Sequence, residues 1–402
     1  MNKLSNRKIS LNLFLINAFI YISFSQYNPF LAPYFAKAGI NAVEIGILLT
    51  IGPISSILIQ PIWAIISDRT GKRREVLSVV VLGSALSIFS YYIGKTFLSF
   101  FIASTLLAVF STSIVPLSDA IILRSANKNQ LDFSKIRMGG TVGYAIFVIF
   151  AGIIVKRNSD LAFIMGFIGF LILFIFVRLL PKDDAIETLP KKEYLHMDRE
   201  TKPRGSLLHI FESKQIYFLL AFAFISQVGL SFVFSFQSVY MVHMGFSTQT
   251  IGITGSIAAI SELPVLFLMN RVLNKVSPTK ITILACFILA LRIITVTGES
   301  LFFVILSQAL HGLSFMTIYF CCAVFISKNV KPENQSKGQS ILALIQTGLG
   351  SIVGNILGGY LVDSYGLKTA FVTMTILIIT VAGLTALLQY IYQRKQKTVI
   401  NE

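Results

Sequence analysis

Long apolar stretches alternate with short polar connections along the whole chain. Twelve of these stretches are long enough to cross a bilayer, which takes roughly 20 helical residues each. They are predicted at 11–36, 43–67, 76–94, 98–123, 138–156, 161–180, 215–241, 249–270, 281–298, 301–326, 339–361 and 369–393. One long polar stretch, residues 181–214, separates the sixth segment from the seventh. The pattern predicts an all-α integral membrane protein with two six-helix bundles, 1–180 and 215–402, and a cytoplasmic linker between them.

The composition agrees with a membrane protein. Of 402 residues, 54% are hydrophobic and 13% are charged, whereas a soluble chain carries about a quarter charged residues. The 34 Lys and Arg lie between apolar segments, and not clustered among soluble elements as in a nucleic-acid-binding protein. Cys286, Cys321 and Cys322 all lie in apolar stretches, and we expect them to be free thiols. The chain contains no catalytic signature, so we expect no enzyme, no metal and no nucleic-acid partner.

The basic residues predict the orientation in the membrane. Of the 34 Lys and Arg, 28 lie on the side that includes both termini, five lie on the opposite side, and Arg292 lies within a span. Loops rich in Lys and Arg remain in the cytoplasm. Both termini are therefore expected in the cytoplasm, in the cell membrane of a bacterium. The expected partners are the lipid bilayer, protons and a small-molecule substrate, and the protein is expected to be a monomer.

The two halves resemble each other. A shift of 206 residues aligns Tyr34 with Tyr240, Gly39 with Gly245, and Ile45-Gly46 with Ile251-Gly252. Parallel six-helix repeats are the plan of transporters that hold substrate near the bilayer midplane and expose it to each side in turn. The duplication predicts a transporter that works by alternating access, because a pore or a sensor has no need of it.

The loop between the second and third segments carries a family signature. It reads Ala64-Ile-Ile-Ser-Asp-Arg-Thr-Gly-Lys-Arg-Arg74, and it resembles the Gly-x-x-x-Asp-Arg-x-Gly-Arg-Arg loop of the major facilitator superfamily. An ordinary positive-inside loop would explain the basic residues alone. The resemblance implies the major facilitator fold and a conformational gate formed by Asp68, Arg69, Gly71 and Arg73, with Ala64 in place of the first Gly.

Asp119 and Arg137 flank one short polar hairpin, and each faces a long apolar stretch. A charge at the rim or interior of a bilayer costs at least a few kcal/mol unless it is paired or faces water. An acid and a base on neighbouring helices can clamp hydroxyl groups, or a substrate's own charge, while neutralising each other. Tyr144, two helical turns after Arg137, lies on the same face and could stack on a ring. Alternatively, both are boundary residues, and Asp119 pairs locally with Arg124.

A closer resemblance covers this region. Gln60-Pro61, Ser67-Asp68 and above all Phe133-Ser-Lys-Ile-Arg-Met-Gly-Gly-Thr-Val-Gly-Tyr144 resemble the lactose permease branch of oligosaccharide–proton symporters and the related phenylpropionate and nucleoside permeases. The resemblance implies that Asp119 occupies the position of a substrate-binding Glu, and that Arg137 is its partner. It also implies that Tyr144 replaces a stacking Trp and Thr141 a nearby Cys. Gln26 and Asn28, just before Pro29, could line the same cavity or mark a plain kink.

The second half places an acid, a base and a histidine deep within spans. Arg292 lies 12 residues past Lys280, roughly 18 Å deep, and Glu262 lies roughly 13 Å deep. His311 can titrate near physiological pH. On adjacent helices the three could couple proton movement to transport, or form a satisfied structural polar cluster. The resemblance implies that Arg292 and His311 belong to a coupling network, with Ser314 where the branch has its proton-carrying Glu.

Together these features predict a proton-coupled symporter that imports a small polar or aromatic solute, namely a sugar or glycoside, a nucleoside or an aromatic acid. Its energy would come from the proton gradient, with no cofactor. The alternative is a proton-coupled antiporter that exports drugs or metabolites. Exporters of this superfamily usually carry Gly-x-x-x-Gly-Pro-x-x-Gly-Gly on the fifth helix, and the stretch from Gly139 to Gly152 contains no Pro.

Overall fold

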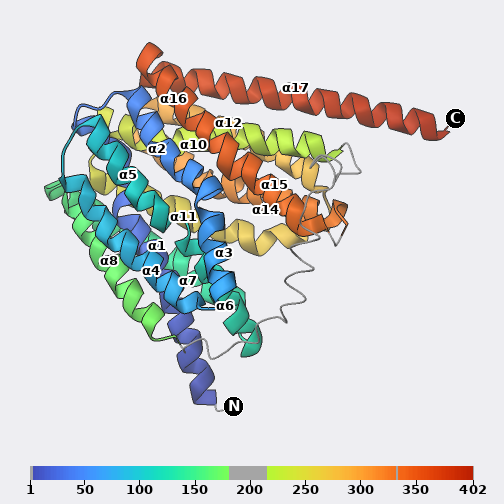
Figure 1. The fold of residues 1–402 in the computed structure, drawn as a ribbon. Coiled ribbons are helices and arrows are strands. Elements are labelled where there is room, and N and C mark those ends of the chain that lie inside the picture. Colours follow the sequence, from blue (N-terminus) through green and yellow to red (C-terminus); the bar gives the residue numbers. More distant parts are fainter. Residues whose placement is uncertain (1–2, 181–214, 332–333, 402) are drawn as a thin grey trace. The chain divides into compact units, whose positions relative to one another are not determined.

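The computed structural model describes residues 3–180, 215–331 and 334–401, and every regular element in these ranges is helical (Figure 1). Twelve spans within them are long and apolar enough to cross a membrane, which confirms the predicted fold class. The spans are Arg7–Lys37, Ala42–Thr70, Arg73–Tyr92, Phe97–Lys128, Lys135–Arg157, Leu161–Arg178, Gln215–His243, Thr248–Met269, Pro278–Gly298, Leu301–Asn329, Lys337–Tyr365 and Leu367–Lys395. The predicted linker, 181–214, lies outside the described residues.

Several spans continue beyond the apolar stretches that predicted them. The fourth ends at Lys128 and not at 123, and the eleventh ends at Tyr365 and not at 361. A hydropathy pattern follows the side chains and stops at the first cluster of polar residues. Helical hydrogen bonding involves the backbone, so it continues through polar residues until a cap or a Gly ends it.

Two compact units make up the chain, and each is described by itself. The first comprises Met1–Ile40, Ile54–Gly205 and Phe246–Ser256, and the second comprises Asn41–Pro53, Ser206–Gly245 and Ile257–Glu402. Helices of the first are α1 (Lys3–Lys37), α3 (Gln60–Thr70), α4 (Arg73–Ser87), α5 (Phe97–Ser111), α6 (Ile114–Lys128), α7 (Phe133–Arg157) and α8 (Leu161–Arg178), with the short turn η1 (Ile88–Tyr92). Two helices, α2 (Ala42–Leu58) and α11 (Thr248–Leu273), contribute residues to both units.

The second unit contains two wide, π-helical turns, η4 (Gly312–Met316) and η6 (Leu344–Gly350). Its α-helices are α10 (Gln215–His243), α12 (Pro278–Thr295), α13 (Leu301–Ala309), α14 (Thr317–Asn329), α15 (Gln335–Ala343), α16 (Ser351–Tyr365) and α17 (Leu367–Asn401), with the short turn η3 (Val296–Gly298) after α12. π-Helical turns such as η4 and η6 are rare and concentrate at functional sites. The first of them directly follows His311, so the predicted proton-coupling region is built on an irregular helix.

Glycines allow α1 and α7 to approach closely in the first unit. A side chain at Gly140 would overlap the Asn17 amide and the Tyr21 ring, and the backbone N–H of Gly140 donates to Asn17 Oδ1 at 2.9 Å. Small residues at contacts between membrane helices let backbones pack at close range. This contact lies one helical turn after Arg137 and therefore fixes that part of α7 against α1.

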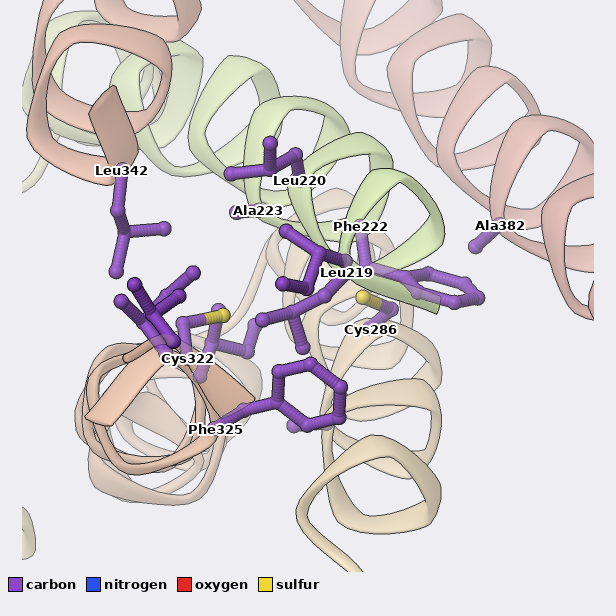
Figure 2. Close-up of a cluster of buried hydrophobic side chains, with 14 residues drawn as sticks. Leu219, Leu220, Phe222, Ala223, Cys286, Cys322, Phe325, Leu342 and Ala382 are labelled. Carbon is purple, nitrogen blue, oxygen red and sulfur yellow. The ribbon is translucent and has the colours of Figure 1, made fainter. Parts of the chain in front are cut away.

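The core of the second unit includes two of the cysteines. Cys286 of α12 and Cys322 of α14 lie among Leu219, Phe222 and Phe325 (Figure 2). These two and Cys321 are free thiols, and each is 0% exposed. This confirms the prediction of three free thiols that pack as small hydrophobic side chains.

Repeat-related glycines adopt the same conformation in the two halves. Gly39 has φ +84° and Gly245 has φ +83°, in the left-handed region that favours glycine. In the second unit Gly46 lies against the backbone carbonyl of Asn355, and in the first unit Gly252 lies against that of Val148. The sequence matches at a shift of 206 residues therefore coincide with matching backbone roles.

Candidate substrate and proton sites

Asp119 of α6 and Arg137 of α7 form an ion pair across the hairpin that joins these helices. Arg137 Nη1 lies 3.2 Å from Asp119 Oδ1 and 3.3 Å from Oδ2. The Asp119 side chain is 33% exposed and that of Arg137 is 41% exposed. The pair is therefore formed with both side chains partly exposed. The structure brings together the two residues that the sequence singled out.

Tyr21 and Asn17 of α1 support this pair, and the sequence reasoning missed both. The guanidinium of Arg137 lies over the Tyr21 ring, 5.3 Å from its centroid, in cation–π geometry. Asn17 holds the neighbouring turn of α7 through Gly140. Gly139-Gly140 was the available signal, because adjacent glycines in a span indicate a close helix contact.

The other predicted substrate residues lie at varied positions. Thr141 and Tyr144 follow Arg137 by one and two turns on the same continuous helix, and both are half-buried. The amide nitrogen of Gln26 donates to Ile22 O at 3.1 Å and to Ser25 Oγ at 3.0 Å, so this side chain is bonded to its own helix. Asn28 is exposed. Thr141 and Tyr144 therefore continue the face that Arg137 begins.

In the second unit, Glu262 of α11 meets His311, which lies between α13 and η4. His311 Nε2 and Glu262 Oε1 are 3.0 Å apart. The His311 side chain is 6% exposed and that of Glu262 is 18% exposed. The ring of Phe315 stacks on His311 at 5.1 Å between centroids, and Phe234 of α10 meets it edge-on at 5.7 Å. Two aromatic rings thus pack against His311, the imidazole side of the pair.

Arg292 of α12 is the third predicted member of this cluster and is 1% exposed. Its Nη2 donates to Gln308 Oε1 at 3.5 Å, and its guanidinium lies 5.8 Å from the centroid of the Phe234 ring. Among the described residues, its Nε and Nη1 have no hydrogen-bond partner, and neither has Nδ1 of His311. Leaving a buried charged group short of partners costs free energy. Glu262 also interacts electrostatically with Arg292.

The charges in this cluster balance only when no extra proton is present. With His311 neutral, the carboxylate of Glu262 and the guanidinium of Arg292 cancel. One added proton leaves a net charge of +1, whether Glu262 or His311 holds it. In surroundings of low dielectric, this change in net charge interacts strongly with neighbouring charged and polar groups. Within the described ranges, this cluster included, no three His, Cys, Asp or Glu side chains lie close enough together to hold a metal ion.

The predicted gate residues form a capped turn in the first unit. Gly71 ends α3 with φ +68°, and its N–H donates to Ser67 O at 3.1 Å. Asp68 Oδ1 accepts from Arg73 Nη2 at 3.1 Å, while Arg69 is exposed. The neighbouring Arg74 is buried and donates to the carbonyl of Leu180 at 2.9 Å. The loop thereby connects the start of α4 with the chain just after α8.

Twelve spans in duplicated halves, with ionisable clusters inside the spans, define a transporter of the major facilitator type. The chain belongs to the MFS_1 like family, whose model matches residues 8–373. It is a multi-pass membrane transporter and not an enzyme.

Individual relatives agree with this family, and a solved structure shares its fold. The maltose permease of Geobacillus stearothermophilus is 24% identical over 92% of this chain and 91% of its own length. The lactose permease of Citrobacter freundii is 20% identical over 87% of each chain. The crystal structure of the nucleoside transporter NupG matches 94% of this chain and 98% of its own with a TM-score of 0.78, at 18% identity. At that identity, the likeness to NupG concerns the fold.

Proposed function

We propose that this protein is a proton-coupled symporter that imports a small solute carrying a hydroxylated ring, a glycoside or a nucleoside, by alternating access. Asp119 and Arg137 hold the solute, and Glu262 with His311 and Arg292 carries the proton. The single observation that carries the proposal is the 3.0 Å contact between His311 and Glu262 beside the buried Arg292. Enclosed acid–histidine contacts of this kind within spans are typical of proton relays.

The chemistry of the first unit supports a hydroxylated ring. A carboxylate accepts hydrogen bonds from hydroxyl groups and a guanidinium donates them, so Asp119 and Arg137 can bind neighbouring hydroxyls from two sides. Tyr21 already lies under the guanidinium, and Tyr144 lies two turns further along α7. The permeases of maltose and lactose, among the similar proteins, take substrates that contain such a ring. An aromatic acid would use Arg137 alone and leave the Asp119 carboxylate facing a like charge.

We place the protein in the bacterial cell membrane with both termini in the cytoplasm, driven by the proton gradient without a cofactor. The excess of Lys and Arg on the side of the termini supports this orientation. In it, the Asp68–Arg73 loop lies on the cytoplasmic side, where we assign it the role of conformational gate.

The test uses right-side-out membrane vesicles in a weakly buffered medium without a proton gradient. Glycosides and nucleosides are added one at a time. The transported solute is expected to raise the external pH, because a proton enters the vesicle with it. In parallel, vesicles given an inward proton gradient are expected to accumulate that solute, and this accumulation is expected to collapse when a protonophore is added. Aromatic acids form the comparison set.

Each alternative gives a different result in this experiment. Accumulation without any external pH change would contradict proton symport. Acidification of the medium when a solute is added outside the vesicles would indicate antiport, because the exchange then moves solute inward and protons outward. Transport of aromatic acids with no response to glycosides or nucleosides would overturn the proposed substrate class but leave the coupling intact.

A further inference from the structure

A second contact lies directly beside the Glu262–His311 pair. Ser261 immediately precedes Glu262 on α11, and Gly312 immediately follows His311 at the start of η4. The backbone N–H of Gly312 donates to Ser261 Oγ at 2.9 Å. Glu262 and His311 are therefore each next in sequence to one partner of this hydrogen bond. The bond connects α11 with the start of η4 directly beside the pair.

The contact requires a glycine. A Cβ atom at position 312 would overlap the carbonyl group of Ser261 and come within 2.9 Å of the backbone nitrogen of Glu262. No rotation of a side chain can relieve an overlap with backbone atoms, so any larger residue would push the two helices apart. The hydrogen bond between the helices therefore depends on the absence of a side chain at 312.

The serine is held in place on its own helix. Ser261 Oγ donates to Ala258 O at 2.6 Å. Its single hydroxyl proton is engaged there, so its lone pairs remain available to accept the N–H of Gly312. On the other side, the backbone widens into the π-helical turn η4, and Ser314 Oγ bonds the carbonyls of Leu310 and His311 at 3.0 Å each. Both partners of the contact are thus fixed by local hydrogen bonds.

We propose that Ser261 and Gly312 are positioning residues that hold the Glu262 carboxylate at hydrogen-bond distance from His311 and so set the pH at which transport is coupled. The inference rests on the proposed role of Glu262 and His311 in proton coupling. Among the described residues, Arg292 is a charged group that interacts with both members of this pair. Arg292 approaches from α12, α10 presents Phe234, and beyond Phe315 lies Tyr319 of α14.

The test compares Ser261→Ala, Ser261→Thr and Gly312→Ala in vesicles, with Ser226→Ala as the matched control. Ser226 is also buried in the second unit, but its hydroxyl bonds only Ala223 O on its own helix, at 3.0 Å. Uptake driven by a proton gradient is measured from pH 5 to 9. Exchange of labelled for unlabelled solute at equal concentration, which needs no net proton movement, is measured in parallel.

Ser261→Ala is expected to shift the pH midpoint of uptake by about 0.5 to 1 unit, the equivalent of one neutral hydrogen bond. It is expected to leave exchange within about twofold of the parent, and Ser261→Thr, which keeps a hydroxyl, is expected to restore the parent profile. Gly312→Ala is expected to reduce uptake about tenfold, since the helices must separate. Ser226→Ala is expected to show the parent profile.

Glu262→Gln separates the two proposals. If Glu262→Gln abolishes the pH dependence while the Ser261→Ala profile coincides with that of the parent, the positioning role is wrong and proton coupling stands. If Glu262→Gln leaves accumulation and its pH dependence unchanged, the proposed coupling role fails, and the positioning role with it. Should Gly312→Ala not reach the membrane, the two Ser261 variants decide the question.

Discussion

Residues Asp119 and Arg137 differ from the other ion pair on the same hairpin in burial. Asp132 and Lys135 lie 3.8 Å apart with side chains 50% and 82% exposed, whereas Asp119 is 33% and Arg137 41% exposed. Exposed pairs of this kind contribute little free energy, because solvent screens them. Loss of one partner matters more where the remaining charge is partly desolvated. The two pairs therefore offer a matched comparison within one hairpin.

Asp119→Asn is expected to weaken solute binding at least about tenfold, the usual effect of losing one hydrogen bond to a charged group. It should also leave the Arg137 guanidinium without its counter-charge. Binding is measured by calorimetry on purified protein with the solute identified in the vesicle screen.

The control for that measurement is Asp132→Asn, which removes a carboxylate from the exposed pair and is expected to leave affinity within about twofold. Equal losses in the two variants would mean that the hairpin as a whole, and not the Asp119–Arg137 pair, is responsible. Undiminished binding in Asp119→Asn would contradict the clamp.

At the residue scale, the sequence singled out charged residues that the structure brings together in pairs, and it did not single out the uncharged residues that contact them. Asp119, Arg137, Glu262 and Arg292 stand out because a charge in or beside an apolar stretch is costly and therefore has a reason to be there. Tyr21, Asn17 and Ser261 carry no such signal, since amides, hydroxyls and rings are common within membrane helices. Their contacts depend on which helices become neighbours, and the linear pattern does not encode that.

At the scale of helix ends, each unit has a cluster of a tyrosine, an acid and a lysine. In the first unit, Tyr34 donates to Asp160 at 2.8 Å, and Lys95 lies 3.6 Å from the same carboxylate. In the second, Tyr240 donates to Glu299 at 3.0 Å, with Lys368 at 3.1 Å. The tyrosines are repeat-related, since they align at a shift of 206 residues.

The acid and the lysine have exchanged places between the two clusters. Lys95 precedes α5 and Asp160 precedes α8, the fourth and sixth spans. Glu299 precedes α13, the tenth span, while Lys368 begins α17, the twelfth. The tenth and twelfth spans correspond to the fourth and sixth. Both units therefore join these helix ends by an acid–lysine ion pair, although the acid and the lysine stand at exchanged positions.

The exchange suggests that the second unit would also be stable with the lysine and the acid in the order found in the first unit. Lys368→Glu is expected to lower the apparent unfolding temperature in detergent, because it places two carboxylates beside Tyr240. The double variant Glu299→Lys with Lys368→Glu reproduces the order of the first unit and is expected to recover most of the loss. A double variant no more stable than Lys368→Glu alone would show that the charge pairing is irrelevant there.

Glu299 also gives an expected dependence of stability on pH. Its hydrogen bonds from Lys368, and then from Tyr240, lower the pKa of its carboxyl below the usual value. Because the pKa is lower in the folded state, ionised Glu299 stabilises the fold at pH values above the unfolded pKa of about 4.3, and this contribution is lost as the pH falls through the folded pKa. The unfolding temperature of Glu299→Gln should therefore lie below that of the parent at pH 7.

The difference between Glu299→Gln and the parent is expected to shrink as the pH falls below about 4.3 and the parent carboxyl becomes protonated. Asp363→Asn, at an exposed carboxylate of α16, is the control, and its difference from the parent should not follow this course. A gap for Glu299→Gln that stays constant between pH 7 and pH 3 would contradict the proposed role of the carboxylate.

For the whole molecule, the sequence predicted the number and the class of the spans because about 20 apolar residues in a row have few alternatives in a bilayer. It did not predict that residues 41–53 group with the second unit and residues 246–256 with the first. The glycines Gly46 and Gly252, which lie in those two segments, meet backbone carbonyls within the units they join. Such grouping arises from close packing between backbones, and hydropathy contains no information on it.

The charge pattern also predicts how the whole molecule is oriented across the membrane. The buried cysteines make it testable in the full chain: Cys286, Cys321 and Cys322 are 0% exposed, so the parent protein should not react with a membrane-impermeant maleimide. Lys37 and Lys72 are exposed at helix ends on opposite sides of the predicted membrane. Lys37→Cys is expected to be labelled in intact cells, because its loop carries few cations and lies outside.

Lys72→Cys, in the basic loop that contains Asp68 and Arg73, should be labelled only after the cells are permeabilised. The parent, treated identically, reports any background from the native thiols. Labelling of Lys72→Cys in intact cells, with Lys37→Cys protected, would reverse the orientation. It would also move the Asp68–Arg73 gate to the outer face, where a loop of four basic residues would oppose the positive-inside rule.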